Sequence, residues 1–208
     1  MKVGIVSESP ADEAGLKILV EAILGRAVEA EPLKVRTRGW TAVIGNLPSF
    51  YKALHWKSEA EGIIAVIDSD DTTPHDGSHE ATGFDHPQCR LCEIYRKILD
   101  IQRNITPRPH LPPLKFAIGL AVPAIEAWYR CGKDVHSTEA RFKREHIQSL
   151  QSTRRQLKLD TYGSIAPPSD VLIKHAREEC TRLATQLNLL ELHFPTGFGV
   201  LARSLRQW

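Results

Sequence analysis

The chain has 208 residues, of which 42% are hydrophobic and 25% are charged, and this ordinary composition excludes a disordered, fibrous or collagen-like protein. No apolar run approaches the roughly 20 residues that a membrane helix needs, and the four cysteines predict a reducing, cytoplasmic environment, not a disulfide-bonded secreted scaffold. The net charge of +2 hides an asymmetry, because residues 1–104 carry 12 bases and 16 acids whereas residues 105–208 carry 15 bases and 9 acids.

The first part of the chain is predicted to alternate strands and helices. Residues 2–6 form a β-rich run, and residues 11–24 carry apolar side chains at helical spacing. Residues 32–37 predict a second strand and residues 46–56 a second helix. The continuous β-branched run at 62–67 is typical of a strand that is buried on both faces of a parallel sheet.

The middle of the chain continues this alternation. The polar segment 72–87 is predicted to be a loop, and residues 89–103 a helix with one apolar face. Residues 115–122 predict a fourth strand, and residues 123–130 a helix that begins with proline. This order favours an α/β fold with a mostly parallel four-stranded sheet flanked by helices.

The remainder of the chain is polar and helical in pattern. Helices are expected over residues 169–190 and 199–207. We therefore predict an α/β metal-binding domain over residues 1–133 and a helical C-terminal extension over residues 134–208, packed together as one compact unit.

Acidic residues follow three of the predicted strands. Glu8 follows the first strand, Asp68 and Asp70 follow the third, and Glu126 lies in the first turn of the helix after the fourth. Ligands of open α/β sheets bind outside the carboxyl ends of the strands, so these acids and Asp12 are expected to converge. Such a group needs cations or protons, and its oxygen ligands suit Mg²⁺ or Mn²⁺. The alternative is that Asp12 and Glu126 are helix N-terminal charges favoured by the helix dipole.

Four segments carry a resemblance to a known family, in the order in which they occur. The first, Ser7–Asp12, is similar to an E-G-P-T-E/D turn, and the second, Val66–Asp71, contains the pattern D-x-D. The third, Ala121–Trp128, is similar to A-V-P-E-x-E-A-W, and the fourth, His193–Phe198, lies near the place of a P-S-F motif. Together they resemble the Toprim domain of topoisomerases, primases and OLD-family nucleases, and most closely a small stand-alone Toprim-like family often encoded near ATPases.

The resemblance implies roles for the acidic residues. Glu8, Asp68 and Asp70 would be catalytic, with Glu8 binding metal or acting as acid and base and the two aspartates binding Mg²⁺. Asp12 and Glu126 would complete a second metal site, as in two-metal Toprim nucleases.

The resemblance also implies a function and one departure from the family pattern. The protein would be a Mg²⁺-dependent nuclease acting on DNA or RNA, and the effector of a prokaryotic anti-phage system that works with an ABC-type ATPase. Ser9 replaces the glycine that usually follows the first glutamate, and a shape that needs a positive φ suits glycine better than serine. The turn is therefore expected to differ in shape.

Three cations near the fourth strand are candidates for phosphate contact. They are Lys115, Arg130 and Lys133, chosen by proximity in sequence. The alternative is that they are ordinary surface cations.

A histidine and cysteine cluster precedes the helix predicted at 89–103. The Cys-x2-Cys step formed by Cys89 and Cys92, with His86 as a further ligand, could chelate a structural Zn²⁺, and His75 and His79 lie nearby. The alternative is that both cysteines face the core from the start of the helix.

Two further functional interpretations stay open. One is a non-catalytic binding or regulatory subunit of an ATPase complex, in which Ser9 marks a degenerate site. The other is a metal-dependent nucleotidyl or phosphoryl transferase that uses the same carboxylates.

Overall fold

The computed structural model describes residues 1–32, 39–145 and 147–208, and its centre is a four-stranded parallel sheet. The strand order is β2-β1-β3-β4, so β3 lies between β1 and β4. Residue Ile64 of β3 pairs with Ile5 on one side and with Ala117 on the other. The strands are β1 (Lys2–Val6), β2 (Glu29–Glu31), β3 (Gly62–Asp68) and β4 (Lys115–Ala121).

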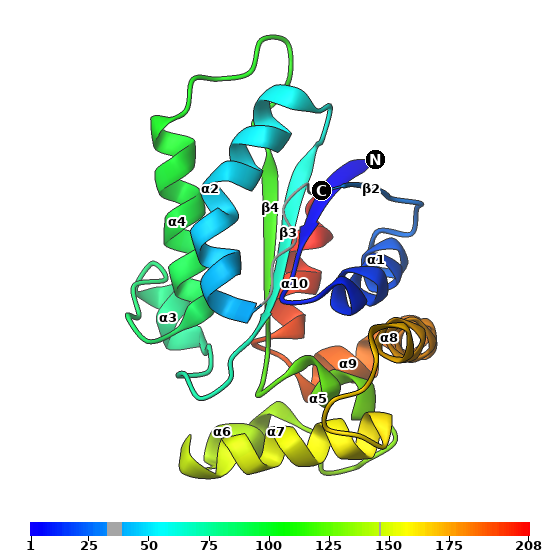
Figure 1. Ribbon diagram of the computed structural model, residues 1–208. Coiled ribbons are helices and arrows are strands. Elements are labelled where there is room, and N and C mark those ends of the chain that lie inside the picture. The colour runs from blue at the N-terminus through cyan, green and yellow to red at the C-terminus, as the bar shows by residue number, and fades with distance from the viewer. Residues whose placement is uncertain (33–38, 146) are drawn as a thin grey trace.

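Helices cover both faces of this sheet and the edge at which the strands end (Figure 1). Helices α2 and α4 lie together on one face, α1 and α10 pack on the other, and α5, α6 and α7 lie beneath the strand ends. The helices are α1 (Pro10–Leu24), α2 (Gly39–Lys57), α3 (Gly77–Ala81), α4 (Arg90–Asn104), α5 (Ile125–Arg130), α6 (Glu139–Arg144), α7 (Ile147–Tyr162), α8 (Ser169–Ala184), α9 (Leu187–His193) and α10 (Phe198–Leu205).

The β-branched run of β3 forms the middle of the core. Its side chains from Ile63 to Ile67 are at most 2% exposed, because helices cover both faces of the sheet. Burial on both faces selects such a continuous apolar run over an alternating one. The predicted α/β fold with a parallel four-stranded sheet is therefore confirmed.

Helix α1 has clear signals at both ends. The Ser9 side chain accepts a hydrogen bond from the backbone N–H of Asp12, and Pro10 stands at the first helical position. Gly25 ends the helix in the left-handed region, at φ 64°. Within the helix, Gly15 lets α8 approach closely, because a Cβ there would press on Cys180 Sγ and the Ala176 carbonyl oxygen.

Several predicted boundaries differ from the observed ones. The strand predicted at 32–37 lies, except for Pro32, outside the described residues, and the second described strand is β2 at Glu29–Glu31. Helix α2 begins at Gly39 rather than at residue 46, and it continues through Pro48. The segment predicted as a loop contains the short helix α3, which Asp76 caps by accepting from Ser78 N.

The helical part after residue 133 packs against the sheet-bearing part of the chain. Helix α8 lies along α1, and α10 lies on β4. The single helix predicted over 169–190 is divided into α8 and α9, with Thr185 and Gln186 between them. In the part of the chain that the structure describes, no helix is both long and apolar enough to cross a membrane.

A substitution at Gly197 tests the contact between the C-terminal part and the sheet. A Cβ at this position would clash with the carbonyl oxygen of Leu120 in β4, which cannot move without disturbing the sheet. We expect Gly197→Ala to lower the free energy of unfolding by about 1–3 kcal/mol, as overpacking does, measured by urea denaturation.

The matched variant is Gly45→Ala in α2, where a Cβ would meet nothing within 4 Å. It should raise stability by about 0.5–1 kcal/mol, because alanine is the better helix former. A Gly197→Ala protein as stable as the wild type would contradict the described packing.

Candidate functional site

Acidic residues from three strand ends meet at the carboxyl edge of the sheet. Glu8 Oε1 accepts a hydrogen bond from the backbone N–H of Asp68, at 3.1 Å. Asp68 Oδ1 in turn accepts from the backbone N–H of Ile125, at 2.9 Å. Two carboxylates thus join the ends of β1 and β3 to the start of α5, the helix that follows β4.

Two more carboxylates lie beside this chain of contacts. Glu126 stands in the first turn of α5, is only 5% exposed, and its Oε2 has no hydrogen-bond partner among the described residues. Asp12, in the first turn of α1, is close enough to Glu126 and Glu8 for their charges to raise its pKa. All five acids predicted at this edge lie close enough for their charges to interact, because Glu126, Glu8, Asp12 and Asp70 all raise the pKa of Asp68.

Burial makes this group of like charges costly to ionise. Burial raises the pKa of Asp12 to about 7, and the charges of Glu126 and Glu8 add to the shift. Burial, and then the charges of Glu126 and Glu8, raise the pKa of Asp68. The pKa values of Glu8 and Glu126 are also raised, mainly by burial. A buried group of this kind holds protons or is neutralised by cations.

Three basic side chains supply part of the neutralising charge. Arg90 Nη1, from α4, donates to Asp70 Oδ2 at 2.7 Å and to the carbonyl oxygen of Asp68 at 2.8 Å. Arg154, from α7, forms an ion pair with Asp70 Oδ1, and the charge of Lys158 on the same helix lowers the pKa values of Asp12 and Glu126. These three residues were not among the predicted site residues.

The backbone at Asp70 directs its side chain into this arrangement. Its φ is 52°, in the left-handed region that aspartate tolerates better than most residues other than glycine. Its backbone N–H donates to the carbonyl oxygen of Pro123, at 2.9 Å, so the turn after β3 is fastened to the segment between β4 and α5.

Ser9 does not distort the turn that follows β1. Its φ is −149° and its ψ is 155°, an extended conformation that any residue adopts. A glycine is therefore not required here, and the expected difference in loop shape has no basis in the backbone angles of residue 9. The serine instead caps α1 and helps to place Asp12.

The three cations predicted to contact phosphate are not brought to the carboxylates. Lys115 opens β4, and about 20 Å of strand, at ~3.3 Å per residue, separates it from the site; its Nζ donates to the carbonyl oxygen of Trp208. Arg130 faces the carbonyl oxygen of Asp160 at 3.4 Å. Lys133 forms an ion pair with Glu179 of α8.

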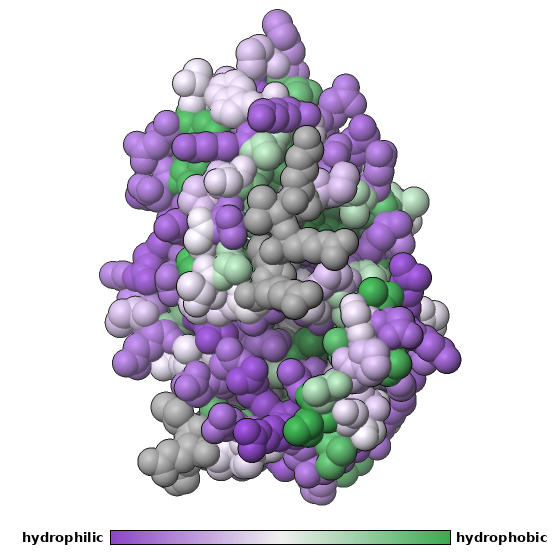
Figure 2. Space-filling view, in the orientation of Figure 1, coloured by the Kyte–Doolittle hydropathy of each residue, from purple (hydrophilic) through white to green (hydrophobic). Residues whose placement is uncertain are grey.

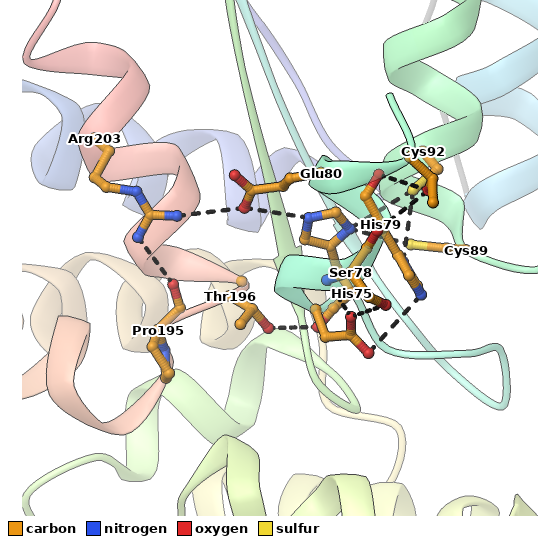
Figure 3. Close-up of polar contacts among 12 residues, drawn as sticks. His75, Ser78, His79, Glu80, Cys89, Cys92, Pro195, Thr196 and Arg203 are labelled. Carbon is orange, nitrogen blue, oxygen red and sulfur yellow. Dashed lines mark hydrogen bonds and ion pairs between the residues drawn. The ribbon is translucent and has the colours of Figure 1, made fainter. Parts of the chain in front are cut away.

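A second cluster lies between α3 and the start of α4. His75, His79, Cys89 and Cys92 are all buried, and their ligand atoms lie within 4.8 Å of one another, so this group could hold a metal ion (Figure 3). The predicted set of His86 with the two cysteines needs correction, because His86 lies outside this group and its ring stacks on that of His79. The spacing of the three histidines in the sequence does not indicate which of them lie beside the cysteines.

Strongly hydrophilic residues gather on the surface at the level where the strands end. Figure 2, in the orientation of Figure 1, shows them below the grey segment and above the helices at the base of the molecule.

Comparison of the chain with protein-family models, with curated proteins and with solved structures gave no match.

The raised carboxyl pKa values predict how stability depends on pH. A carboxyl whose pKa is higher in the folded state binds more protons there than in the unfolded chain, so stability is lost as pH rises through the folded pKa. For Asp12 this window runs from its ordinary value of 3.8 to about 7. In the presence of EDTA, we expect the free energy of unfolding to fall from pH 5 to pH 8.

The Asp12→Asn variant should show a smaller fall over that range, because it removes one of these carboxyls. Glu59→Gln, at a side chain that is 81% exposed, should keep the wild-type dependence. Urea denaturation at several pH values measures both variants. Identical pH profiles of the wild type and Asp12→Asn would contradict the described environment of Asp12.

Proposed function

We propose that the protein is a metal-dependent nuclease that hydrolyses phosphodiester bonds of DNA or RNA. The observation that carries the proposal is the convergence of partly or fully buried carboxylates and basic side chains at one edge of the sheet. The carboxylates are Glu8, Asp12, Asp68, Asp70 and Glu126, and the bases are Arg90, Arg154 and Lys158. Acids that hold a divalent cation beside bases that hold a phosphate are the two parts that this reaction needs.

The ligand type suits Mg²⁺ or Mn²⁺, although among the described residues only the group of His75, His79, Cys89 and Cys92 has its ligand atoms within 4.8 Å of one another. Every candidate ligand is a carboxylate oxygen, and the buried Oε2 of Glu126 lacks a hydrogen-bond partner among the described residues. A buried carboxylate oxygen without a partner is the kind of group that an ion satisfies. We assign Glu8, Asp12, Asp68 and Glu126 to hold the cation. When bound there, Mg²⁺ would stabilise the charge that develops on the phosphate oxygens and lower the pKa of a coordinated water.

Asp70 is assigned a different role from the one that the D-x-D pattern predicts. Both of its carboxylate oxygens are engaged by guanidinium groups, Oδ2 by Arg90 and Oδ1 by Arg154. It therefore positions two arginines at the edge of the carboxylate site. A guanidinium offers the planar pair of donors that suits a phosphate, so we propose that Arg90 and Arg154 orient the nucleic-acid backbone.

The resemblance to Toprim-like proteins supports the same function and adds a partner. In that family the catalytic carboxylates lie at the ends of the first and third strands, as Glu8 after β1 and Asp68 at the end of β3 do here. We propose on this ground alone an anti-phage role with an ABC-type ATPase.

Cleavage assays on plasmid DNA and on RNA test the function directly. We expect cleavage that requires Mg²⁺ or Mn²⁺, alone or with the neighbouring ATPase. Asp68→Asn should lower the rate roughly 100-fold or more, because ion binding contributes several kcal/mol to the transition state. The asparagine keeps an oxygen that can accept from Ile125 N, so the fold should be retained.

The control for this assay is Asp71→Asn, at an exposed acid three residues further along the chain, which should cleave at the wild-type rate. Equal cleavage by wild type and Asp68→Asn would refute the site assignment. Nucleoside triphosphate consumption without cleavage would favour the transferase interpretation. Nucleic-acid or ATPase binding with neither activity would favour the regulatory subunit.

Arg154 provides a separate prediction about substrate binding. We expect Arg154→Gln to raise KM for nucleic acid roughly 10-fold, with a smaller change in kcat, because a charged hydrogen bond worth about 1.5–3 kcal/mol is lost. The salt dependence of binding should weaken as one phosphate contact disappears. The matched variant is Arg155→Gln, at an exposed neighbour on α7, which should change KM far less. Equal effects of the two substitutions would show that Arg154 acts only through general surface charge.

A further inference from the structure

The second cluster has the dimensions of a zinc site. His75 Nδ1 lies 3.7 Å from Cys89 Sγ and 3.6 Å from Cys92 Sγ, and His79 Nδ1 lies 3.7 Å from Cys92 Sγ. Tetrahedral zinc with Zn–S of about 2.3 Å and Zn–N of about 2.0–2.1 Å sets its nitrogen and sulfur ligands about 3.5 Å apart. The three observed distances agree with that separation between ligand atoms.

The burial of the cluster fits a closed, structural site. His75, Cys89 and Cys92 are 0% exposed and His79 is 5% exposed. An ion held by these four ligands would have no coordination position open to solvent, and this feature distinguishes structural zinc from catalytic zinc. Two thiolates and two imidazoles select zinc over Mg²⁺, which prefers oxygen ligands.

A carboxylate lies on the far side of each imidazole ring of the cluster. His75 Nε2 lies 3.6 Å from Glu80 Oε1, and His79 Nε2 lies 3.9 Å from Asp76 Oδ2. Figure 3 shows Glu80 between the ring of His75 and Arg203. Carboxylates placed behind ligand histidines fix ring orientation and raise basicity in metal sites.

Both cysteines lie at the start of α4. Cys89 is the N-cap residue of this 15-residue helix, and Cys92 lies in its first turn. The two cysteines are three residues apart at the start of one helix, a spacing that lets both bind the same ion.

The cluster is joined directly to the carboxylate site through Arg90. This residue follows Cys89, and its guanidinium bonds to Asp70 and to the Asp68 carbonyl while lying over the ring of Trp40, 5.1 Å from its centroid. Whatever fixes the first turn of α4 therefore fixes Arg90.

A further connection runs to the C-terminal part of the chain. The carbonyl oxygen of His75 accepts hydrogen bonds from Lys143 Nζ and from Thr196 Oγ1. The buried Glu139 in turn accepts from Thr196 and forms an ion pair with Lys143. The loop that carries His75 is thus held from two sides.

We propose that His75, His79, Cys89 and Cys92 bind one structural Zn²⁺, which fixes the start of α4 and thereby the position of Arg90 at the carboxylate site. The zinc site itself does not depend on the nuclease proposal. The experiments that test it measure the zinc content and the hydrogen exchange of backbone amides. Their outcome therefore does not depend on whether the protein has nuclease activity.

Metal analysis of the full chain, expressed without a histidine tag and purified without chelator, gives the primary test. Inductively coupled plasma mass spectrometry should find about one zinc per chain; less than ~0.2 would overturn the proposal. Protein loaded with Co²⁺ should show the intense visible bands of a tetrahedral site with two thiolates. A weak octahedral spectrum would also overturn it.

Matched variants locate the ion. Cys92→Ala should lose zinc, whereas Cys131→Ala should retain it, although Cys131 is also buried and its Sγ lies 3.7 Å from the ring nitrogen of His193. In the same way His79→Ala should lose zinc and the stacked His86→Ala should retain it. Equal zinc contents within either pair would overturn the assignment. If Cys92→Ala does not fold, the Co²⁺ spectrum of the wild type decides.

Hydrogen exchange tests the effect of the ion on α4. The backbone N–H of Thr73 donates to the Gln88 carbonyl and that of Glu93 to the Cys89 carbonyl, so these amides report on the cluster. Removing zinc should accelerate exchange within residues 73–93 at least ~10-fold and leave residues 2–6 of β1 unchanged. Unchanged exchange in 73–93, or equal acceleration in both segments, would overturn the positioning role.

Discussion

The structure depends on how the sheet accommodates buried negative charge at its carboxyl edge. Glu8 and Asp68 each accept a backbone N–H from the next strand or helix along the edge. The carboxylates therefore act as links between three strand ends, and they could not be replaced by apolar residues without leaving those N–H groups unpaired. Their accumulated charge must be balanced, and this requirement explains why α4 and α7 direct arginines to the same place.

The balance of charge unites parts of the chain that composition alone would separate. The acidic first half supplies Glu8, Asp12, Asp68 and Asp70, whereas the basic second half supplies Glu126 together with Arg154 and Lys158 of α7. The small net charge is thus the sum of two complementary surfaces that meet. Other basic residues of the second half pair with acids away from this site, as Lys133 does with Glu179.

Much of the fold could be predicted because the relevant signals are local. The β-branched run at 62–67 is typical of a buried strand, and Pro10 and Gly25 mark the ends of α1 within the sequence. The convergence of Glu8, Asp68 and Glu126 followed from strand ends meeting at one edge. Helix α3 was missed because its five residues carry no apolar period, and its cap at Asp76 looks like any polar turn.

The cations and the histidine set could not be predicted for a different physical reason. Lys115 is near the fourth strand in sequence, yet a strand is long, and its first residue lies at the edge opposite its last. Arg90 and Arg154 reach Asp70 only because two helices from distant parts of the chain pack beside it. His86 is nearest in sequence to the cysteines, but its ring lies against His79 and takes no place in the cluster.

Under the proposed function, the double engagement of Asp70 would couple phosphate binding to cation binding. A phosphate that took the guanidinium of Arg154 would leave Oδ1 of Asp70 without its cation, while Arg90 would stay on Oδ2. The charge released at Asp70 would act on Glu8, whose pKa already responds to it. Phosphate binding at Arg154 and cation binding at the carboxylates would then strengthen each other, as a thermodynamically linked pair of sites.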